Sequence, residues 1–110
     1  MFELFNINKN ESAKYLYRDI ESLLYSVFNK GKKRCKLYSC SAEIWQFNGI
    51  LALVSYGTPI AVFMPGVGSF YDCLRVVYGY TATSSQHISK FKKWLAENNY
   101  TVKYTVRFTN

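Results

Sequence analysis

An Asn48-Gly49 pair between two β-type segments is the feature of this sequence that most constrains its fold. A two-residue type I′ turn needs positive φ at both of its central positions, and asparagine followed by glycine adopts this conformation readily. The pair therefore predicts an antiparallel hairpin with strands over 42–47 and 50–56. Two further segments rich in branched and aromatic residues are expected to form strands, at 36–40 and 59–64.

A helix is expected on each side of this group of strands. Apolar residues recur at the three-and-four spacing of one helical face from Ala13 to Phe28, which predicts a core-facing helix over about 11–29. A second helix is expected to run to about residue 97, with Ile88, Phe91 and Leu95 as its apolar stripe. The candidate N-cap residues of this second helix are Thr83, Ser84 and Ser85.

The remaining strands complete the predicted fold. Residues 70–80 are expected to hold one or two strands, and a short strand is expected over 2–7. The segment 100–109 alternates apolar and polar residues, which is typical of a strand with a polar, basic outer face. The predicted class is α+β, an antiparallel sheet of about five or six strands in a single domain over 1–110, with both helices packed on one face.

The composition and the cysteine spacing exclude several classes of protein. The chain of 110 residues is 49% hydrophobic and carries a formal net charge of +7, so we expect one folded domain with a bias toward polyanions. Three cysteines without metal-ligand spacing argue against a disulfide framework, a metal site or a cofactor. The sequence shows no secretory signal and no apolar run of membrane-spanning length, so we expect a cytoplasmic protein without a membrane partner.

Few residues are suited to catalysis. His87 is the single histidine, and an enzyme would need it as a base beside Cys35, Cys40 or Cys73. The spacing does not favour such a pair, because cysteines in apolar surroundings usually pack as small core residues. We therefore expect no enzymatic activity, and a local structural contact for His87.

Basic residues form the most informative functional pattern. Five cations fall within seven residues after the first helix, and this density is typical of an anion-binding patch. The patch comprises Lys30, Lys32, Lys33, Arg34 and Lys36. A second basic surface, which requires the second helix and the last strand to be neighbours, comprises Lys90, Lys92, Lys93, Lys103 and Arg107. Tyrosines lie close to both groups, and aromatic rings among cations are suited to stacking on unpaired bases. The alternative is that these lysines only solvate the surface and the tyrosines only fill the core.

Two segments carry a resemblance to a known group of proteins. The first is SYGTPIA at 55–61, and the second is YTATSSQHI at 80–88, followed by Phe91 one helical turn later. This combination resembles a pattern of small uncharacterised proteins encoded by bacteriophages and other mobile elements of Gram-positive and gut bacteria. The resemblance covers about the second third of the chain, and the lysine-rich and tyrosine-rich flanks lie outside it.

The resemblance implies a protein of the bacterial host cell that acts by binding. The leading interpretation is an anti-CRISPR-type inhibitor whose partner is a host defence nuclease, a Cas protein, or the guide and target nucleic acid held by it. The alternative is a basic nucleic-acid-binding accessory protein, whose affinity falls steeply with salt because neutralised phosphates release counterions. The sequence leaves the identity of the target and the oligomeric state open.

Overall fold

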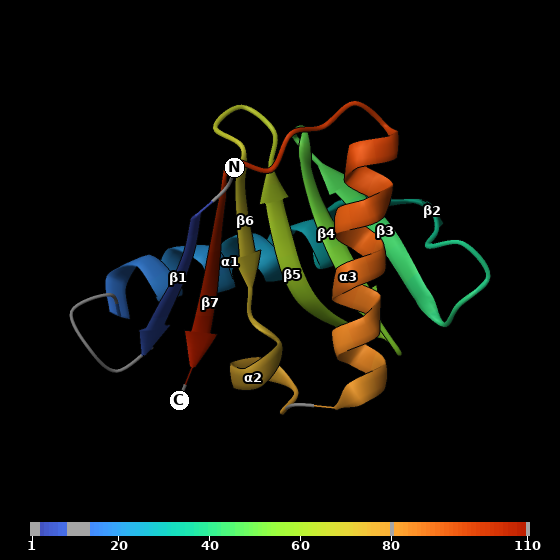
Figure 1. Cartoon of the computed structure of the whole chain (residues 1–110). Coiled ribbons are helices and arrows are strands. Elements are labelled where there is room, and N and C mark those ends of the chain that lie inside the picture. The colour runs from blue at the N-terminus through green and yellow to red at the C-terminus, as the bar shows by residue number, and fades with distance from the viewer. Residues whose placement is uncertain (1–2, 9–13, 80, 110) are drawn as a thin grey trace.

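The structure is a computed structural model that describes residues 3–8, 14–79 and 81–109. Within these residues the chain forms one seven-stranded sheet with a long helix on each face, as Figure 1 shows. The elements in chain order are β1 (Glu3–Asn8), α1 (Lys14–Lys30), β2 (Lys32–Lys36), β3 (Ala42–Phe47), β4 (Ile50–Ser55), β5 (Thr58–Met64), β6 (Ser69–Asp72), α2 (Leu74–Val77), α3 (Ala82–Glu97) and β7 (Tyr104–Thr109).

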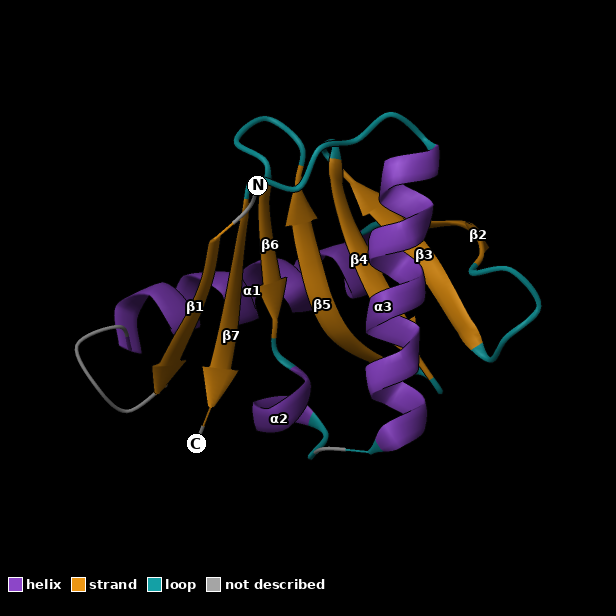
Figure 2. Ribbon diagram, in the orientation of Figure 1, coloured by secondary structure: helices purple, strands orange, loops and turns teal. Residues whose placement is uncertain are grey.

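The strand order in the sheet is β1-β7-β6-β5-β4-β3-β2. The α+β class is confirmed, but the expected antiparallel sheet of five or six strands is wrong in its detail. Strand β7 pairs in parallel with both β1 and β6, whereas the neighbours from β6 to β2 are all antiparallel (Figure 2). The mixed sheet arises because α3 carries the chain back across the sheet and lets β7 enter between β1 and β6.

The central hairpin has the predicted form. Phe47 and Ile50 are register partners across a two-residue turn, and the φ values of Asn48 and Gly49 are 50° and 80°. The expected strands at 42–47, 50–56 and 59–64 correspond to β3, β4 and β5 within one residue. The turn residues thus determine the register of this part of the sheet.

The core has two sides, because α1 and α3 cover opposite faces of the sheet (Figure 1). On the α3 side, Phe91 and Leu95 pack with Phe63 and Phe70 in one buried cluster. On the α1 side, a second cluster holds apolar residues of α1, β5 and β7: Tyr17, Ile20, Leu24, Val62, Val106 and Phe108. The expectation that both helices pack on one face is therefore wrong. Strands covered on both faces have nearly continuous apolar sequences, as β4 and β5 do here.

Strand β2 lies earlier than predicted. It occupies the highly charged Lys32–Lys36 segment, whereas residues 37–40 form the connection to β3. Lysine-rich strands are unfavourable inside a sheet but common at its edge, where their charge discourages pairing with other chains. The first helix ends at Lys30, as expected, and its predicted start at 11–13 lies outside the described residues.

The segment after β6 forms a helix instead of a second strand. Helix α2 begins directly after Cys73, and Asp72 Oδ1 accepts a hydrogen bond of 3.1 Å from the Leu74 backbone N–H. The N-cap of α3 also differs from the prediction. Thr81, not Thr83, Ser84 or Ser85, caps the helix, and its hydroxyl accepts a hydrogen bond of 3.1 Å from the Ser84 N–H.

Strand β7 begins at Tyr104 and is covered on both sides. Val106 and Phe108 face α1, but Thr105 on the other face is buried as well. The prediction of a polar, basic outer face for this strand is therefore wrong, because β7 lies inside the sheet and its polar side chains contact neighbouring elements. Among the described residues, the helices are too short or too polar to cross a lipid bilayer.

Candidate functional site

The first predicted basic patch lies along one edge of the sheet. Lys30 ends α1, and β2 follows as the edge strand, with four of its five side chains exposed. Local charge repulsion is low in such an extended edge, since alternate side chains point to opposite faces. The structure therefore exposes these cations to solvent on both faces of the edge strand.

Arg34 joins this edge to α3. Its Nη1 lies 3.1 Å from the Tyr100 hydroxyl and 3.4 Å from Gln46 Oε1, and it donates to both. Its guanidinium carbon lies 5.2 Å from the centre of the Trp94 ring, which is a cation–π distance. Arg34 lies at a β-bulge between Lys33 and Cys35, where the register with β3 shifts.

Lys33 points to the opposite side and forms an ion pair. Its Nζ lies 2.9 Å from Glu43 Oε2, and this hydrogen bond, together with one from the Trp45 indole, lowers the pKa of the Glu43 carboxyl. Both side chains are partly exposed, so the pair contributes little to folding stability. It orients Lys33 along the β2 edge.

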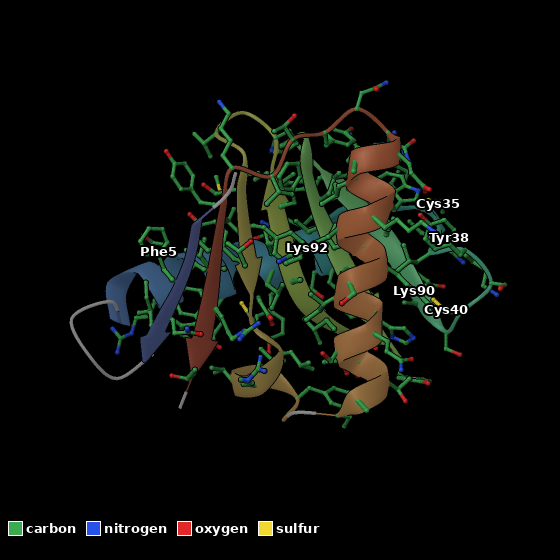
Figure 3. The ribbon with its side chains drawn as sticks, in the orientation of Figure 1. Phe5, Cys35, Tyr38, Cys40, Lys90 and Lys92 are labelled. Atoms are coloured by element: carbon green, nitrogen blue, oxygen red, sulfur yellow. The ribbon has the colours of Figure 1, made fainter. Side chains whose placement is uncertain are left out.

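Tyr38, in the connection after β2, places an exposed aromatic ring beside these charged residues. The ring is 42% exposed, and the Lys93 ammonium lies 5.7 Å from its centre. The hydroxyl donates a hydrogen bond to Glu97, which raises the pKa of Tyr38 to about 12. Figure 3 shows Tyr38 and Lys90 together on the flank of α3 that faces β2 and β3.

A second exposed tyrosine lies at the neighbouring turn. Tyr56 is 54% exposed, and its ring centre lies 5.5 Å from that of His87 on α3. The Tyr56 N–H donates a hydrogen bond of 3.2 Å to the Ser41 carbonyl, which ties this turn to the β2–β3 connection. Tyr38 and Tyr56 have φ values of 56° and 50°, in the left-handed region that bulky residues rarely adopt.

We refer to this combined region as the β2–α3 surface. It comprises Lys32, Arg34, Tyr38, Tyr56, Lys90 and Lys93, whereas Lys33 and Lys36 lie with Glu43 on the other face of the sheet. A hollow of about 370 Å³ lies between its two turns, with Lys36, Ser41 and Gly57 among the lining residues. Among the described residues, the four cations of this surface outnumber the carboxylate that contacts it, Glu97.

The second predicted group of cations is divided by the fold. Lys90 and Lys93 lie on the flank of α3 beside β2, whereas Lys92 lies on the other flank, over β5 and β6 (Figure 3). Helix α3 and β7 are neighbours, as this prediction requires, because Lys92 Nζ donates a hydrogen bond of 3.2 Å to Thr105 Oγ1.

Arg107 and Lys103 are held apart from the β2–α3 surface. Arg107 lies beside the buried Asp72, with a distance of 3.6 Å between its Nε and the carboxylate. Lys103 packs its aliphatic stem close to Gly68, where an added Cβ would come within 2.9 Å of Lys103 Cγ.

His87 belongs to a buried polar cluster that joins the end of β4 to the first turns of α3. Its Nδ1 lies 2.8 Å from Ser55 Oγ, and Ser55 Oγ lies 3.4 Å from Ser84 Oγ. Burial, and secondarily the charge of Lys90, lowers the pKa of His87. The sequence predicted a structural contact for His87 with residues near it in the chain, whereas its partner Ser55 lies on a distant strand and has no local sequence signal.

The cysteines occupy separate places. Cys73 packs in the cluster on the α1 side, where burial raises the pKa of its thiol and keeps it protonated. Cys40 lies on the α3 side and donates through its Sγ to the Leu37 carbonyl at 2.8 Å. Within the described part of the chain, histidine, cysteine and carboxylate side chains do not gather in groups of three that would suit a metal ion.

Residues 25–107 match a family of unknown function, DUF8033. The chain belongs to this family. The DUF8033 match includes all of the β2–α3 surface and both segments of the Ser55–His87 cluster. No curated protein and no solved structure matches the sequence.

Proposed function

We propose that the protein binds single-stranded nucleic acid, without catalysing a reaction, through the β2–α3 surface. The observation that carries this proposal is the pair of exposed tyrosines, Tyr38 and Tyr56, set among lysines. Proteins that bind single strands combine cations that contact phosphates with aromatic rings that stack on bases. Both kinds of group lie on one exposed side of this molecule.

The backbone conformation of the two tyrosines supports a role for their side chains. A left-handed conformation costs a residue other than glycine, asparagine or aspartate roughly 1–2 kcal/mol. Such strain is concentrated at functional sites, where the surrounding structure imposes it. The structural alternative is that Tyr56 serves only to cover His87, and the experiments below separate the two roles.

The lysines are placed to contact phosphates. Within the described residues, Lys32 and Lys90 form no ion pair, and their exposed ammonium groups face solvent. Their charges are thus not neutralised by the protein itself. A strand of nucleic acid along β2 and α3 would release the counterions of its phosphates, which favours binding at low salt.

The test is fluorescence anisotropy of a labelled 20-nucleotide oligo(dT), measured over a range of salt concentrations. The test variant is Lys90→Gln with Lys93→Gln, and the control is Arg18→Gln with Lys103→Gln, which removes the same charge from exposed positions elsewhere. Each lost phosphate contact reduces the slope of log affinity against log salt by about 0.7. We expect a reduction of about 1.4 in the test variant and a slope near that of the unmodified protein in the control.

Equal weakening in both variants would show that only net charge matters, and it would overturn the assignment to this surface. Absence of salt-dependent binding by the unmodified protein would overturn the function itself. A double-stranded oligonucleotide serves as a further comparison, because paired bases do not stack on the tyrosines. Tighter binding of the duplex would contradict the proposal.

The second candidate is an inhibitor of a host defence nuclease, as the phage-like pattern implies. The observation that favours a protein partner is the exposed edge of β2, whose outer main-chain groups are able to pair with a strand of another protein. Four cations in its five residues oppose such pairing, however, and this makes nucleic acid the stronger proposal. Capture of a Cas nuclease in a pull-down, with no binding of free oligonucleotide, would replace the first proposal with the second.

A further inference from the structure

The end of α3 brings a carboxylate to the β2–α3 surface, where the other charged groups are cations. Glu97 is the last residue of the helix, and it is exposed. A phosphate repels a carboxylate, so this residue weakens the attraction between the four cations of the surface and a nucleic-acid backbone. Contacts with phosphates therefore do not account for its presence.

Glu97 is also unfavourable for the helix that carries it. The C-terminal end of a helix has a partial negative charge, so cations are stabilising there and carboxylates are not. The last turn of α3 contains no basic residue to offset this effect. Lys93 lies one turn earlier, but within the described part of the chain it forms no ion pair with Glu97. The carboxylate therefore lowers the stability of the helix end at which it lies.

The Glu97 carboxylate lies beside the exposed ring of Tyr38. The Tyr38 hydroxyl donates a hydrogen bond to Glu97 Oε1 and so holds the two groups together. A carboxylate has about four acceptor sites on its two oxygens, so both oxygens are able to accept further hydrogen bonds. The Lys93 ammonium lies 5.7 Å from the centre of the Tyr38 ring, yet 42% of Tyr38 remains exposed. An accessible ring and a set of acceptors thus adjoin each other on the flank of α3 shown in Figure 3.

Guanine is the base whose hydrogen-bonding groups suit this pair best. Its Watson–Crick edge has two adjacent donors, N1–H and the N2 amino group, which match the two oxygens of a carboxylate. Thymine and uracil have a single donor on that edge. In adenine and cytosine the amino group lies beside a ring acceptor, which a carboxylate repels. Two hydrogen bonds to a charged acceptor therefore favour guanine over the other bases.

We propose that Glu97 makes the β2–α3 surface selective for guanine, by accepting hydrogen bonds from a guanine that is stacked on Tyr38. This inference rests on the proposed function, because it requires that the surface binds single strands. It adds a base preference to a contact that cations and aromatic rings alone would make with any sequence. The alternative is that Glu97 serves only to orient the Tyr38 ring.

The test compares the labelled oligonucleotides d(TG)10, d(TI)10 and oligo(dT) of the same length by fluorescence anisotropy. Inosine lacks the N2 amino group of guanosine, so it keeps the purine ring for stacking and removes one of the two donors. We expect d(TG)10 to bind about tenfold more tightly than d(TI)10, because a hydrogen bond to a charged group contributes about this factor. Equal affinity of the unmodified protein for d(TG)10 and d(TI)10 would overturn the proposal.

Two glutamate variants locate the preference. Glu97→Gln removes the charged acceptor, so the affinities for d(TG)10 and d(TI)10 should come within about twofold of each other, while oligo(dT) binds at least as tightly as before. Glu21→Gln is the matched control, because Glu21 on α1 accepts a hydrogen bond of 3.1 Å from the Tyr17 hydroxyl. It removes the same charge from another tyrosine–glutamate pair and should keep the tenfold ratio. A tenfold ratio that persists in Glu97→Gln, or is lost in Glu21→Gln, would overturn the assignment to Glu97.

A third variant tests the part played by Tyr38. Tyr38→Phe keeps the ring and removes the hydroxyl that holds the carboxylate. It should bind oligo(dT) within about twofold of the unmodified protein but lose most of the preference for d(TG)10 over d(TI)10. An unchanged preference in this variant would contradict the placement of the guanine beside Tyr38 and Glu97.

The oligonucleotides also separate this inference from the proposed function. Salt-dependent binding of oligo(dT), with equal affinities for d(TG)10 and d(TI)10, would overturn the guanine preference and leave the proposed function in place. Absence of salt-dependent binding of all three oligonucleotides would overturn the proposed function and this inference together.

Discussion

The sheet contains two turns with the same backbone but different residues. Asn48-Gly49 joins β3 to β4 and Tyr56-Gly57 joins β4 to β5, each as a two-residue loop. The φ values are 50° and 80° in the first turn, and 50° and 79° in the second. Asparagine is well suited to this conformation, and tyrosine is poorly suited to it.

The comparison identifies a turn position, 56, at which the chain has a residue that is unfavourable for the local backbone conformation. At position 48 the side chain is needed only to form the turn. At position 56 a large ring is retained in a strained conformation, where it lies against His87 and remains more than half exposed. The turn at Tyr56 therefore has a task beyond reversing the chain, and we propose that this task is stacking on a base.

The largest expected effect is that of Tyr56→Asn, which gives the second turn the residue of the first. Loss of one stacked base weakens single-strand binding by about tenfold, a value within the range measured for such rings. Folding stability should change by less than about 1 kcal/mol, because relief of the left-handed strain offsets the lost ring contact. Anisotropy and urea unfolding measure the two quantities. Unchanged binding would leave Tyr56 as a cover for His87 alone.

The reverse exchange, Asn48→Tyr, should affect stability and not binding. The left-handed conformation then carries a bulky residue with no His87 beside it, which lowers the free energy of unfolding by about 1 kcal/mol. Urea unfolding measures this loss, and oligo(dT) affinity should stay within a factor of two of that of the unmodified protein. A stability equal to that of the unmodified protein would contradict the argument from strain at Tyr56.

The smallest expected effect is a dependence of stability on pH through His87. Its pKa in the folded protein lies below the usual 6.5, so the unfolded chain takes up the proton first as pH falls. The stability that depends on a neutral His87 is therefore complete above about pH 6.5. The free energy of unfolding declines as the pH falls from there toward the folded-state pKa. Urea unfolding between pH 7.5 and pH 5 checks this, with ~0.5 pH intervals sufficient to follow the decline.

Two variants sharpen the pH experiment. His87→Gln removes the titrating group and should give a flat profile in this window, since the sequence has no other histidine. Tyr56→Asn uncovers the imidazole and should reduce the decline, because burial is the main cause of the lowered pKa. A decline that persists in His87→Gln would assign the effect to another group.

The parts of the fold that were predicted depend on local signals. Positive φ at Asn48-Gly49 and the apolar periodicity before Lys30 are properties of neighbouring residues, and they located the hairpin and α1. The parallel pairing of β7 depends on contacts between segments that are distant in the sequence. The spacing of apolar residues within one segment does not predict such contacts. The continuous apolar runs of β4 and β5 are typical of strands that are covered on both faces, and they indicate the two-sided arrangement of the helices.

The site shows the same limit. The sequence identified the cations, and helical spacing places Lys90 and Lys92, two residues apart on α3, on different sides of the helix, but it did not show which elements each of them contacts. It predicted a local structural contact for His87, whereas the structure brings a serine from β4, 32 residues away in the sequence, to the imidazole. The left-handed conformation of Tyr38 and Tyr56 was not predicted, because tyrosine rarely adopts it and its residue type gives no signal for it. Gly57 after Tyr56 does indicate a turn at this position.

The position of β7 between β1 and β6 also determines the order in which the sheet is assembled. Strands β2 to β6 each pair with a neighbour in sequence, so they are able to associate as the chain is made. Among the described strands β1 pairs only with β7, and it has no partner in the sheet until residues 104–109 have been synthesised. The earliest described strand is therefore the last to be joined to the sheet, after every other described strand has been made.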